Sequence, residues 1–64
     1  MENVVRVKRN GLGLSQSELG ERVEVSRKTI SQIESGKQAP SVVTALRLGS
    51  VMDCSVEDLF RIEE

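Results

Sequence analysis

Four side chains able to contact base edges fall within six consecutive residues: Arg27, Lys28, Ser31 and Gln32. In the major groove of duplex DNA, Arg and Lys pair with guanine, Gln pairs with adenine, and short hydroxyl groups fit either base. On an α-helix, steps of 100° per residue place Lys28, Ser31 and Gln32 on one polar face, with Arg27 beside them at the start of the helix. This pattern indicates a base-reading face, although Arg-Lys pairs also occur on many ordinary solvated helices.

The segment between Ser26 and Gly36 is the predicted helix that carries these side chains. Ser26 can cap a helix by accepting a backbone N–H, and Gly36 is typical of the left-handed residue that ends one. The charges between them oppose the helix dipole, because Arg27 and Lys28 lie in the first turn and Glu34 in the last. Each misplaced charge costs up to about 1 kcal/mol. A local rule broken without local compensation points to function, here contact with a polyanion.

Capping residues divide the rest of the chain into four further short helices. Ser15-Gln16-Ser17-Glu18 is a capping box, and Ser41 and Ser55 can each cap a later helix. The turn after the first helix is expected to drop Leu12 and Leu14 inward. Because strand signals are nearly absent, we predict an all-α bundle of five helices. The expected helices are residues 3–10, 16–22, 27–35, 42–52 and 56–60.

Composition and charge limit the possible classes of protein. The 64 residues make one small domain, and no apolar run approaches the roughly 18 residues of a membrane span. With Cys54 as its only cysteine and no signal peptide, the chain is expected in the reducing cytoplasm. Residues 1–50 hold eight Lys or Arg against five Asp or Glu, whereas residues 51–64 hold one against five. A basic body with an acidic end is compatible with binding a polyanion through one face.

Enzymatic and metal-binding functions are disfavoured. The sequence has no His for acid–base work, and Cys54 has no partner with which to bind a metal ion. Cys54 is interpreted as a small, half-buried apolar residue rather than a redox sensor. Binding of single-stranded nucleic acid is also disfavoured, because Phe60 is the only aromatic residue and cannot form a stacking platform. No cofactor and no metal ion are expected.

Apolar residues at five positions of segment 16–35, with a glycine between them, carry a resemblance to a known family. They are Leu19, Val23, Val25, Ile30 and Ile33, with Gly20 as the small residue where two helices touch. Together with "LGLSQSEL", "IESGKQAPS" and "CSVEDLF" around them, they resemble the helix-turn-helix core of Cro and phage-repressor-type (XRE) regulators. The resemblance covers essentially the whole chain. It implies a compact five-helix bundle of the lambda-repressor-like DNA-binding type, with residues 1–64 as a single domain.

The resemblance also implies roles for individual residues. Arg9 and Glu34 would form a structural ion pair between the first and third helices. Arg27, Lys28 and Gln32 would face bases. Contacts to sugar and phosphate set the register on DNA without reading sequence. For Gln16, Lys37 and Gln38, the alternative is an ordinary solvated position on the protein surface. The implied backbone contacts are Gln16, Ser26, Thr29, Lys37 and Gln38.

Four residues depart from the family pattern. Glu24 stands where the family often has Gly, at a turn position that can need a positive φ. Asp53 likewise replaces a common Gly. Thr44 takes a usually aliphatic place and Gly49 a place that is usually Ala, so both are expected to soften the fourth helix.

Regulators of this kind usually bind near-palindromic sites as twofold dimers, with half-sites about one helical turn apart. We therefore expect a sequence-specific, duplex-DNA-binding homodimer, more often a repressor than an activator, without a small-molecule effector. Phage or plasmid repressor, restriction-modification controller and antitoxin all remain open. The alternative is a helical protein-interaction module that keeps the fold with little DNA reading. Residues 42–64 are expected to support dimerisation, through Val43, Leu46, Val56, Phe60 and Ile62.

Overall fold

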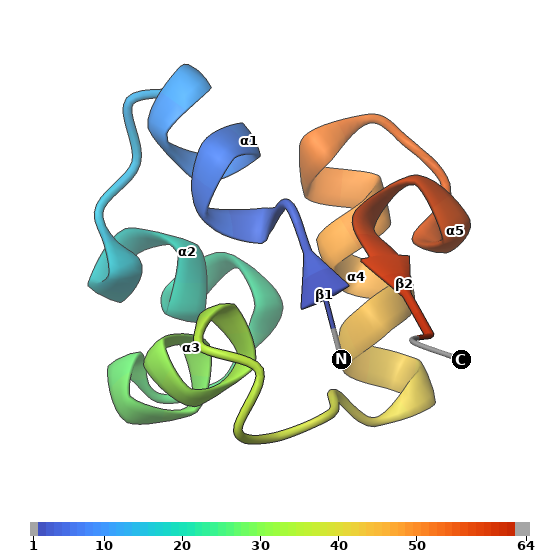
Figure 1. The fold of residues 1–64 in the computed structure, drawn as a ribbon. Coiled ribbons are helices and arrows are strands. Elements are labelled where there is room, and N and C mark those ends of the chain that lie inside the picture. The colour runs from blue at the N-terminus through green and yellow to red at the C-terminus, as the bar shows by residue number, and fades with distance from the viewer. Residues whose placement is uncertain (1, 63–64) are drawn as a thin grey trace.

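A computed structural model describes residues 2–62 as five helices and one two-stranded antiparallel sheet (Figure 1). Helices α1 to α3 form one part of the molecule, and α4 and α5 cover its other side (Figure 1). The predicted five-helix bundle is confirmed. None of the helices in residues 2–62 is long and apolar enough to cross a membrane. The elements are β1 (Glu2–Asn3), α1 (Val5–Gly11), α2 (Gln16–Val23), α3 (Arg27–Glu34), α4 (Val42–Met52), α5 (Val56–Leu59) and β2 (Phe60–Arg61).

Serine side chains start four of the five helices at the predicted places. In each case the serine hydroxyl accepts the backbone N–H three residues further along the chain, which satisfies a donor that the helix itself cannot pair. In two of the four, the backbone N–H of the serine also donates to the carboxylate three residues further along, which completes a capping box. The capping serines are Ser15, Ser26, Ser41 and Ser55.

The short sheet was not predicted from the sequence. Its register pairs Glu2 with Arg61 and Asn3 with Phe60. As a result, the predicted first helix begins at Val5 rather than residue 3, and the predicted fifth helix ends at Leu59 rather than residue 60. Strands of two residues carry no alternating pattern, and their partner lies at the far end of the chain. This pairing therefore depends on tertiary structure rather than on local sequence.

The core is a single cluster in which α2 and α3 supply half of the buried side chains. Leu14 is half-buried as expected, and Leu59 is fully buried. Leu12 was predicted to point inward, but it is 52% exposed. It caps the end of α1, and the left-handed Gly13 (φ 72°) then turns the chain before Leu14 returns to the core. The cluster consists of Val5, Leu19, Val23, Ile30, Ile33, Leu48, Met52 and Leu59.

Two glycines allow close approach of backbones. A Cβ on Gly20 would lie 2.6 Å from the carbonyl oxygen of Val25, in the turn that follows α2. A Cβ on Gly49 would lie 2.8 Å from the carbonyl oxygen of Cys54, which lies just before α5. Gly49 was expected only to soften the fourth helix. The structure gives it a packing reason, because the chain returns directly against α4 at this point.

The other departures from the family pattern also have local explanations. Glu24 (φ 62°) and Asp53 (φ 54°) both adopt the left-handed conformation that glycine usually provides. Thr44 is buried, and its hydroxyl accepts a hydrogen bond from the hydroxyl of Ser41 at 3.0 Å. Ser41, the residue that caps α4, therefore supplies a hydrogen-bond partner for the buried hydroxyl of Thr44.

Candidate nucleic-acid interface

Helix α3 projects from the bundle because its inner face is fixed by the core. Ile30 and Ile33 are fully buried against Leu19 and Val23 of α2. Glu24 ends α2 in a left-handed turn, and Ser26 then starts α3. The orientation of α3 is thus set by a short turn and four apolar side chains, and its opposite face remains available to a ligand.

The start of α3 presents two free cations. Arg27 and Lys28 are exposed, and neither makes an ion pair with any side chain in residues 2–62. Ser26 accepts the N–H of Thr29 at 3.1 Å, and the two hydroxyls share a further hydrogen bond at 3.0 Å. Only one hydroxyl hydrogen is used between them, so the other can donate to an outside acceptor.

The rest of the predicted base-reading face continues along α3. Ser31 and Gln32 are half-buried, one turn beyond Arg27 and Lys28. The structure therefore brings the four predicted base-contacting residues onto one helix, with its cations at the N-terminal end. Recognition helices of the helix-turn-helix class contact bases through their N-terminal residues.

The loop after α3 folds back onto the carbonyl of Gln32. That oxygen accepts the backbone N–H of Lys37 at 3.0 Å, the N–H of Gln38 at 3.2 Å and the hydroxyl of Ser35 at 3.1 Å. Gly36 allows this turn with a φ of 80°. Lys37 and Gln38, two predicted backbone contacts, are consequently held exposed next to the end of α3.

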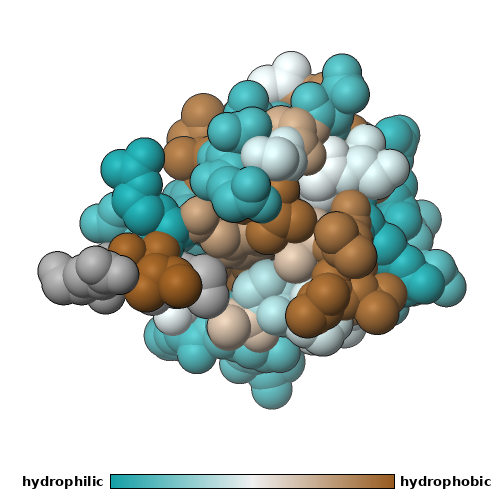
Figure 2. All heavy atoms as spheres, turned by 90° about the vertical axis from the view of Figure 1, so that its right-hand side faces the viewer, coloured by the Kyte–Doolittle hydropathy of each residue, from teal (hydrophilic) through white to brown (hydrophobic). Residues whose placement is uncertain are grey.

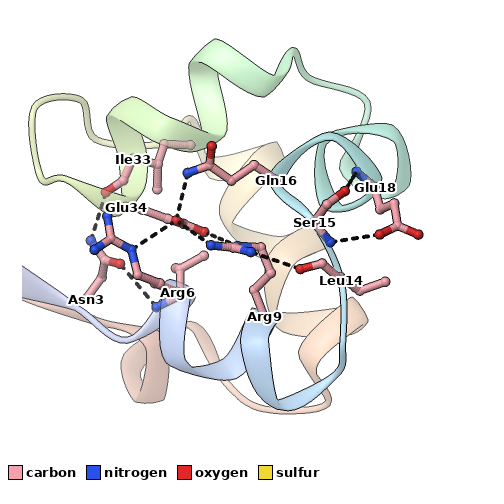
Figure 3. A network of polar contacts seen from close by, with 10 residues as sticks. Asn3, Arg6, Arg9, Leu14, Ser15, Gln16, Glu18, Ile33 and Glu34 are labelled. Carbon is pink, nitrogen blue, oxygen red and sulfur yellow. Dashed lines mark hydrogen bonds and ion pairs between the residues drawn. The ribbon is translucent and has the colours of Figure 1, made fainter.

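The carboxylate of Glu34, the last residue of α3, connects α3 to α1 and α2 (Figure 3). Arg9 donates from Nε to Oε2 of Glu34 at 2.6 Å and from Nη2 to Oε1 at 3.2 Å. Its third nitrogen, Nη1, donates to the carbonyl of Leu14 at 2.9 Å. The Glu34 side chain is 0% exposed, and that of Arg9 is 11% exposed. The pair expected between the first and third helices is therefore present as a buried clamp.

Two further side chains reach the same carboxylate. Gln16 donates from Nε2 to Oε1 of Glu34 at 3.1 Å, and Nε of Arg6 lies 3.5 Å from that oxygen. The sequence assigned Gln16 only to a phosphate contact and gave Arg6 no role. The available signal was the spacing of Arg6 and Arg9, since residues three apart on a helix share a face.

Hydrogen bonding keeps this cluster ionised. Burial alone would raise the pKa of Glu34, but the hydrogen bonds from Arg9 and Gln16 and the charge of Arg9 outweigh it and lower that pKa. The hydrogen bond to Glu34 in turn raises the pKa of Arg9. A carboxylate and a guanidinium locked in their charged forms are suited to structure rather than to proton transfer.

The predicted dimer residues lie on α4, on α5 and at the end of the described part of the chain. Figure 2 shows apolar side chains gathered among polar ones on the face formed by α4, α5 and β2. Val43, Leu46 (60% exposed) and Ile62 are exposed, whereas Val56 and Phe60 are half-buried. All five predicted residues therefore have accessible surface.

The remaining acidic groups do not form a metal site. Within residues 2–62, no three His, Cys, Asp or Glu side chains are arranged to hold a metal ion. An open groove beside the strand pair is lined by four acidic residues, Glu2, Glu34, Glu57 and Asp58, with Arg61. Its excess of carboxylates disfavours phosphate there.

Comparisons with known proteins agree with this geometry. Residues 5–59 match the Helix-turn-helix family. An HTH-type transcriptional regulator of Bacillus subtilis, YgzD, is 41% identical over 64 residues, covering 100% of this chain and 97% of that protein. An HTH-type transcriptional regulator of Methanothermobacter thermautotrophicus is 40% identical over 65 residues, covering 100% of this chain and 94% of the relative.

Solved structures with the same fold include a phage repressor and a restriction-modification controller. The P22 c2 repressor in complex with a synthetic operator has a TM-score of 0.81 and 34% identity, over 83% of this chain and 80% of that one. The restriction-modification controller C.AhdI of Aeromonas hydrophila has a TM-score of 0.78 and 30% identity, over 88% and 85% of the two chains.

Proposed function

Since the chain belongs to the helix-turn-helix family of the Cro and phage-repressor (XRE) type, whose members are DNA-binding transcriptional regulators, we propose that it is a repressor that binds a near-palindromic operator as a homodimer. The reading element is α3, inserted into the major groove. The observation that carries this proposal is the pair of exposed cations at the start of α3, which have no ion-pair partner within residues 2–62, in a helix whose local sequence gives no other reason for them.

Base reading is assigned to Arg27, Lys28, Ser31 and Gln32. The two cations suit guanine and the amide suits adenine, because each can form paired hydrogen bonds to the major-groove edge of its base. Ser31 fits either base with a single hydroxyl. These four side chains cover about one and a half turns of helix, which restricts one protomer to a short half-site.

Backbone contacts would flank the reading helix on both sides. On one side the hydroxyls of Ser26 and Thr29 retain a free hydrogen, and Gln16 has a second amide hydrogen beyond the one it gives to Glu34. On the other side the loop after α3 offers Lys37 and Gln38. Phosphates on both edges of the groove could thus be held while α3 lies between them.

A dimer is supported by the apolar surface on α4, α5 and β2. Val43, Leu46 and Ile62 are large apolar side chains that the monomer leaves exposed, and Val56 and Phe60 lie half-buried beside them. Pairing this surface across a twofold axis would present two copies of α3 to successive major grooves on one side of DNA, about 34 Å apart. A homodimer bound in this way would repress by occupying a promoter, in the cytoplasm where bacterial, archaeal and phage regulators act.

The test is a titration of a labelled random-sequence duplex, followed by fluorescence anisotropy at several salt concentrations. We expect the wild type to bind with a steep salt dependence, of about 0.9 in log–log slope for each phosphate neutralised. The variant Arg27→Ala/Lys28→Ala should bind more weakly and with a smaller slope. The control, Lys8→Ala/Arg22→Ala, removes the same charge from exposed positions of α1 and α2 and should bind as the wild type does.

Absence of duplex binding by the wild type, even at low salt, would contradict the proposal and favour the protein-interaction alternative. If the wild type binds, selection of duplexes from a random pool should recover a near-palindromic sequence. Recovery of a site with no twofold symmetry would remove the homodimer from the proposal while retaining DNA binding.

A further inference from the structure

Three nitrogen donors from two helices converge on one oxygen of Glu34 (Figure 3). Oε1 lies 3.1 Å from Nε2 of Gln16, 3.2 Å from Nη2 of Arg9 and 3.5 Å from Nε of Arg6. The cluster contains two guanidinium groups and one carboxylate, so it carries a net positive charge. The two cations differ in whether an anion from outside can reach them.

Arg9 is not available. All three of its guanidinium nitrogens donate to Glu34 or to the carbonyl of Leu14, and its side chain is almost entirely buried. Arg6 differs in each respect. Its side chain is 61% exposed, only Nε approaches Glu34, and its two terminal nitrogens donate to no acceptor within residues 2–62. The surplus charge of the cluster therefore resides on Arg6.

The need to neutralise the charge of Glu34 does not explain why a second arginine, Arg6, lies beside it. The carboxylate is already paired with Arg9 through two hydrogen bonds, the shorter at 2.6 Å. An additional exposed ion pair at 3.5 Å contributes little to stability. The free, planar fork of terminal nitrogens is the part of an arginine that suits bidentate binding of a phosphate.

Arg6 also lies beside a predicted DNA contact. Because Nε of Arg6 and Nε2 of Gln16 approach the same oxygen, their separation cannot exceed the sum of the two distances to it. This limit is compatible with donation by a terminal nitrogen of Arg6 and by the second amide hydrogen of Gln16 to the non-bridging oxygens of one phosphate group. Glu34 positions both donors without contacting the anion.

From this geometry we propose that Arg6 binds a DNA phosphate together with Gln16, so that α1 contributes to the DNA contact from outside the helix-turn-helix core. This inference rests on the proposed function, since it names a further contact for the same ligand. It assigns Arg6 to affinity and register rather than to sequence reading, because a phosphate carries no base identity.

The experiment compares Arg6→Ala with Lys8→Ala in the same salt-dependent titration of labelled duplex DNA. Both variants remove one exposed cation from α1, but residues two apart project about 200° from each other around a helix. We expect Arg6→Ala to lower the log–log salt slope by about 0.9 for each phosphate that Arg6 neutralises, and Lys8→Ala to leave the slope unchanged. Equal slopes for Arg6→Ala and the wild type would overturn the inference.

A second measurement locates the contact. A single uncharged methylphosphonate is placed at each position of a selected operator in turn, and wild-type affinity is measured for each. At the phosphate that Arg6 contacts, we expect the methylphosphonate to weaken binding by the wild type more than binding by Arg6→Ala, in which Gln16 remains as the other donor. If both proteins respond equally at every position, Arg6 does not contact a phosphate.

Folding and the proposed function are controlled separately. Denaturant unfolding of each variant identifies any loss of the native state. Arg6→Gln, which retains an amide donor for Glu34, replaces Arg6→Ala if the alanine variant does not fold, and it too should lower the slope. If the wild type fails to bind duplex DNA, the proposed function itself fails. If the wild type binds with a steep salt slope and neither Arg6 variant lowers it, only the inference about Arg6 is wrong.

Discussion

Nε of Arg9 lies 2.6 Å from Oε2 of Glu34, an ion pair that connects α1 to the last residue of α3. Glu34 occupies the negative end of the helix dipole, which is locally unfavourable. The clamp compensates for that position by surrounding the carboxylate with donors from α1 and α2. It thereby fixes the end of α3 opposite to the one that carries Arg27 and Lys28.

Breaking this clamp from one side should destabilise the fold strongly. Arg9→Ala leaves the buried carboxylate of Glu34 without its main partner, and we expect a loss of about 3–5 kcal/mol in the free energy of unfolding. Urea denaturation followed by circular dichroism measures the change. The control is Arg6→Ala, whose exposed pair with Glu34 should contribute less than about 1 kcal/mol. Similar losses for the two variants would show that Glu34 is not held mainly by Arg9.

The clamp also predicts how stability depends on pH. The pKa of Glu34 in the folded protein is below its ordinary value of 4.5, so the clamp contributes fully above about pH 4.5. As the pH falls, the unfolded chain takes up its proton first, and this stabilisation is lost until the folded carboxyl is protonated as well. The free energy of unfolding, measured from pH 7 downward, should therefore decrease once the pH drops below about 4.5. Over the same pH range, the difference in unfolding free energy between the wild type and Glu34→Gln should become smaller.

Glu18 contributes to acid sensitivity with the same sign. The backbone N–H of Ser15, together with the Ser15 side chain, lowers the pKa of Glu18. Glu18→Gln is therefore the matched control for the Glu34 experiment. A pH profile that is altered by Glu18→Gln but not by Glu34→Gln would assign the acid transition to the capping box of α2 instead of the clamp.

Close packing at Gly20 should make this position intolerant of any side chain. A Cβ there would lie 2.6 Å from a backbone carbonyl, so Gly20→Ala should cost about 1–3 kcal/mol of stability. Gly11 lies in α1 with no atom within 4 Å of a built Cβ, and Gly11→Ala should be neutral or stabilising by up to about 1 kcal/mol. Thermal unfolding of the two variants compares them directly. Equal tolerance would mean that the turn after α2 can move aside.

Substitutions at a proposed base contact and at a proposed DNA-backbone contact should have different effects on binding. Gln32→Ala should cost about 1–3 kcal/mol of binding free energy on the selected operator and relax preference at one base pair, with little change in the salt slope. Lys37→Ala should weaken binding to all duplexes alike and lower the slope by about 0.9 for each phosphate that Lys37 neutralises. Competition between operator and mismatched duplexes measures both. Uniform weakening by Gln32→Ala would remove that residue from the reading face.

The proposed dimer surface can be tested at its centre. Leu46→Asp places a charge on an exposed apolar position of α4 and should shift the protein to monomer, as measured by analytical ultracentrifugation. Val7→Asp makes the same change at an exposed position of α1, away from the proposed interface, and should leave the association state unchanged. If Leu46→Asp sediments as the wild type does, the dimer forms elsewhere or not at all.

Features governed by neighbouring residues could be predicted from the sequence. Each capping serine bonds to a backbone N–H only three residues away, so the starts of α2 to α5 depend on short segments. The left-handed turn at Gly36 follows from the conformational freedom of that residue. Helical spacing likewise indicated the buried face of α3 through Ile30 and Ile33, and the family resemblance indicated the buried Leu19 and Val23 of α2.

Features that join distant residues were decided only by the tertiary structure. The pairing of β1 with β2 connects the two ends of the chain, and Asn3 also donates from its side chain to the carbonyl of Ile33 at 2.8 Å. No local pattern marks either contact. The same applies to Gly49, whose constraint comes from the carbonyl of Cys54.

The resemblance to a family indicated that Arg9 and Glu34 would pair. The spacing of Arg6 and Arg9 was the one local sign for Arg6, and no local pattern brought Gln16 to the same carboxylate. Residue types, caps and spacing determined which helix carries the proposed reading face, because those signals act over one or two turns of helix. The convergence of α1, α2 and α3 on Glu34 required the packed bundle, since a side chain reaches a partner on another helix only after the core has set the distance between them.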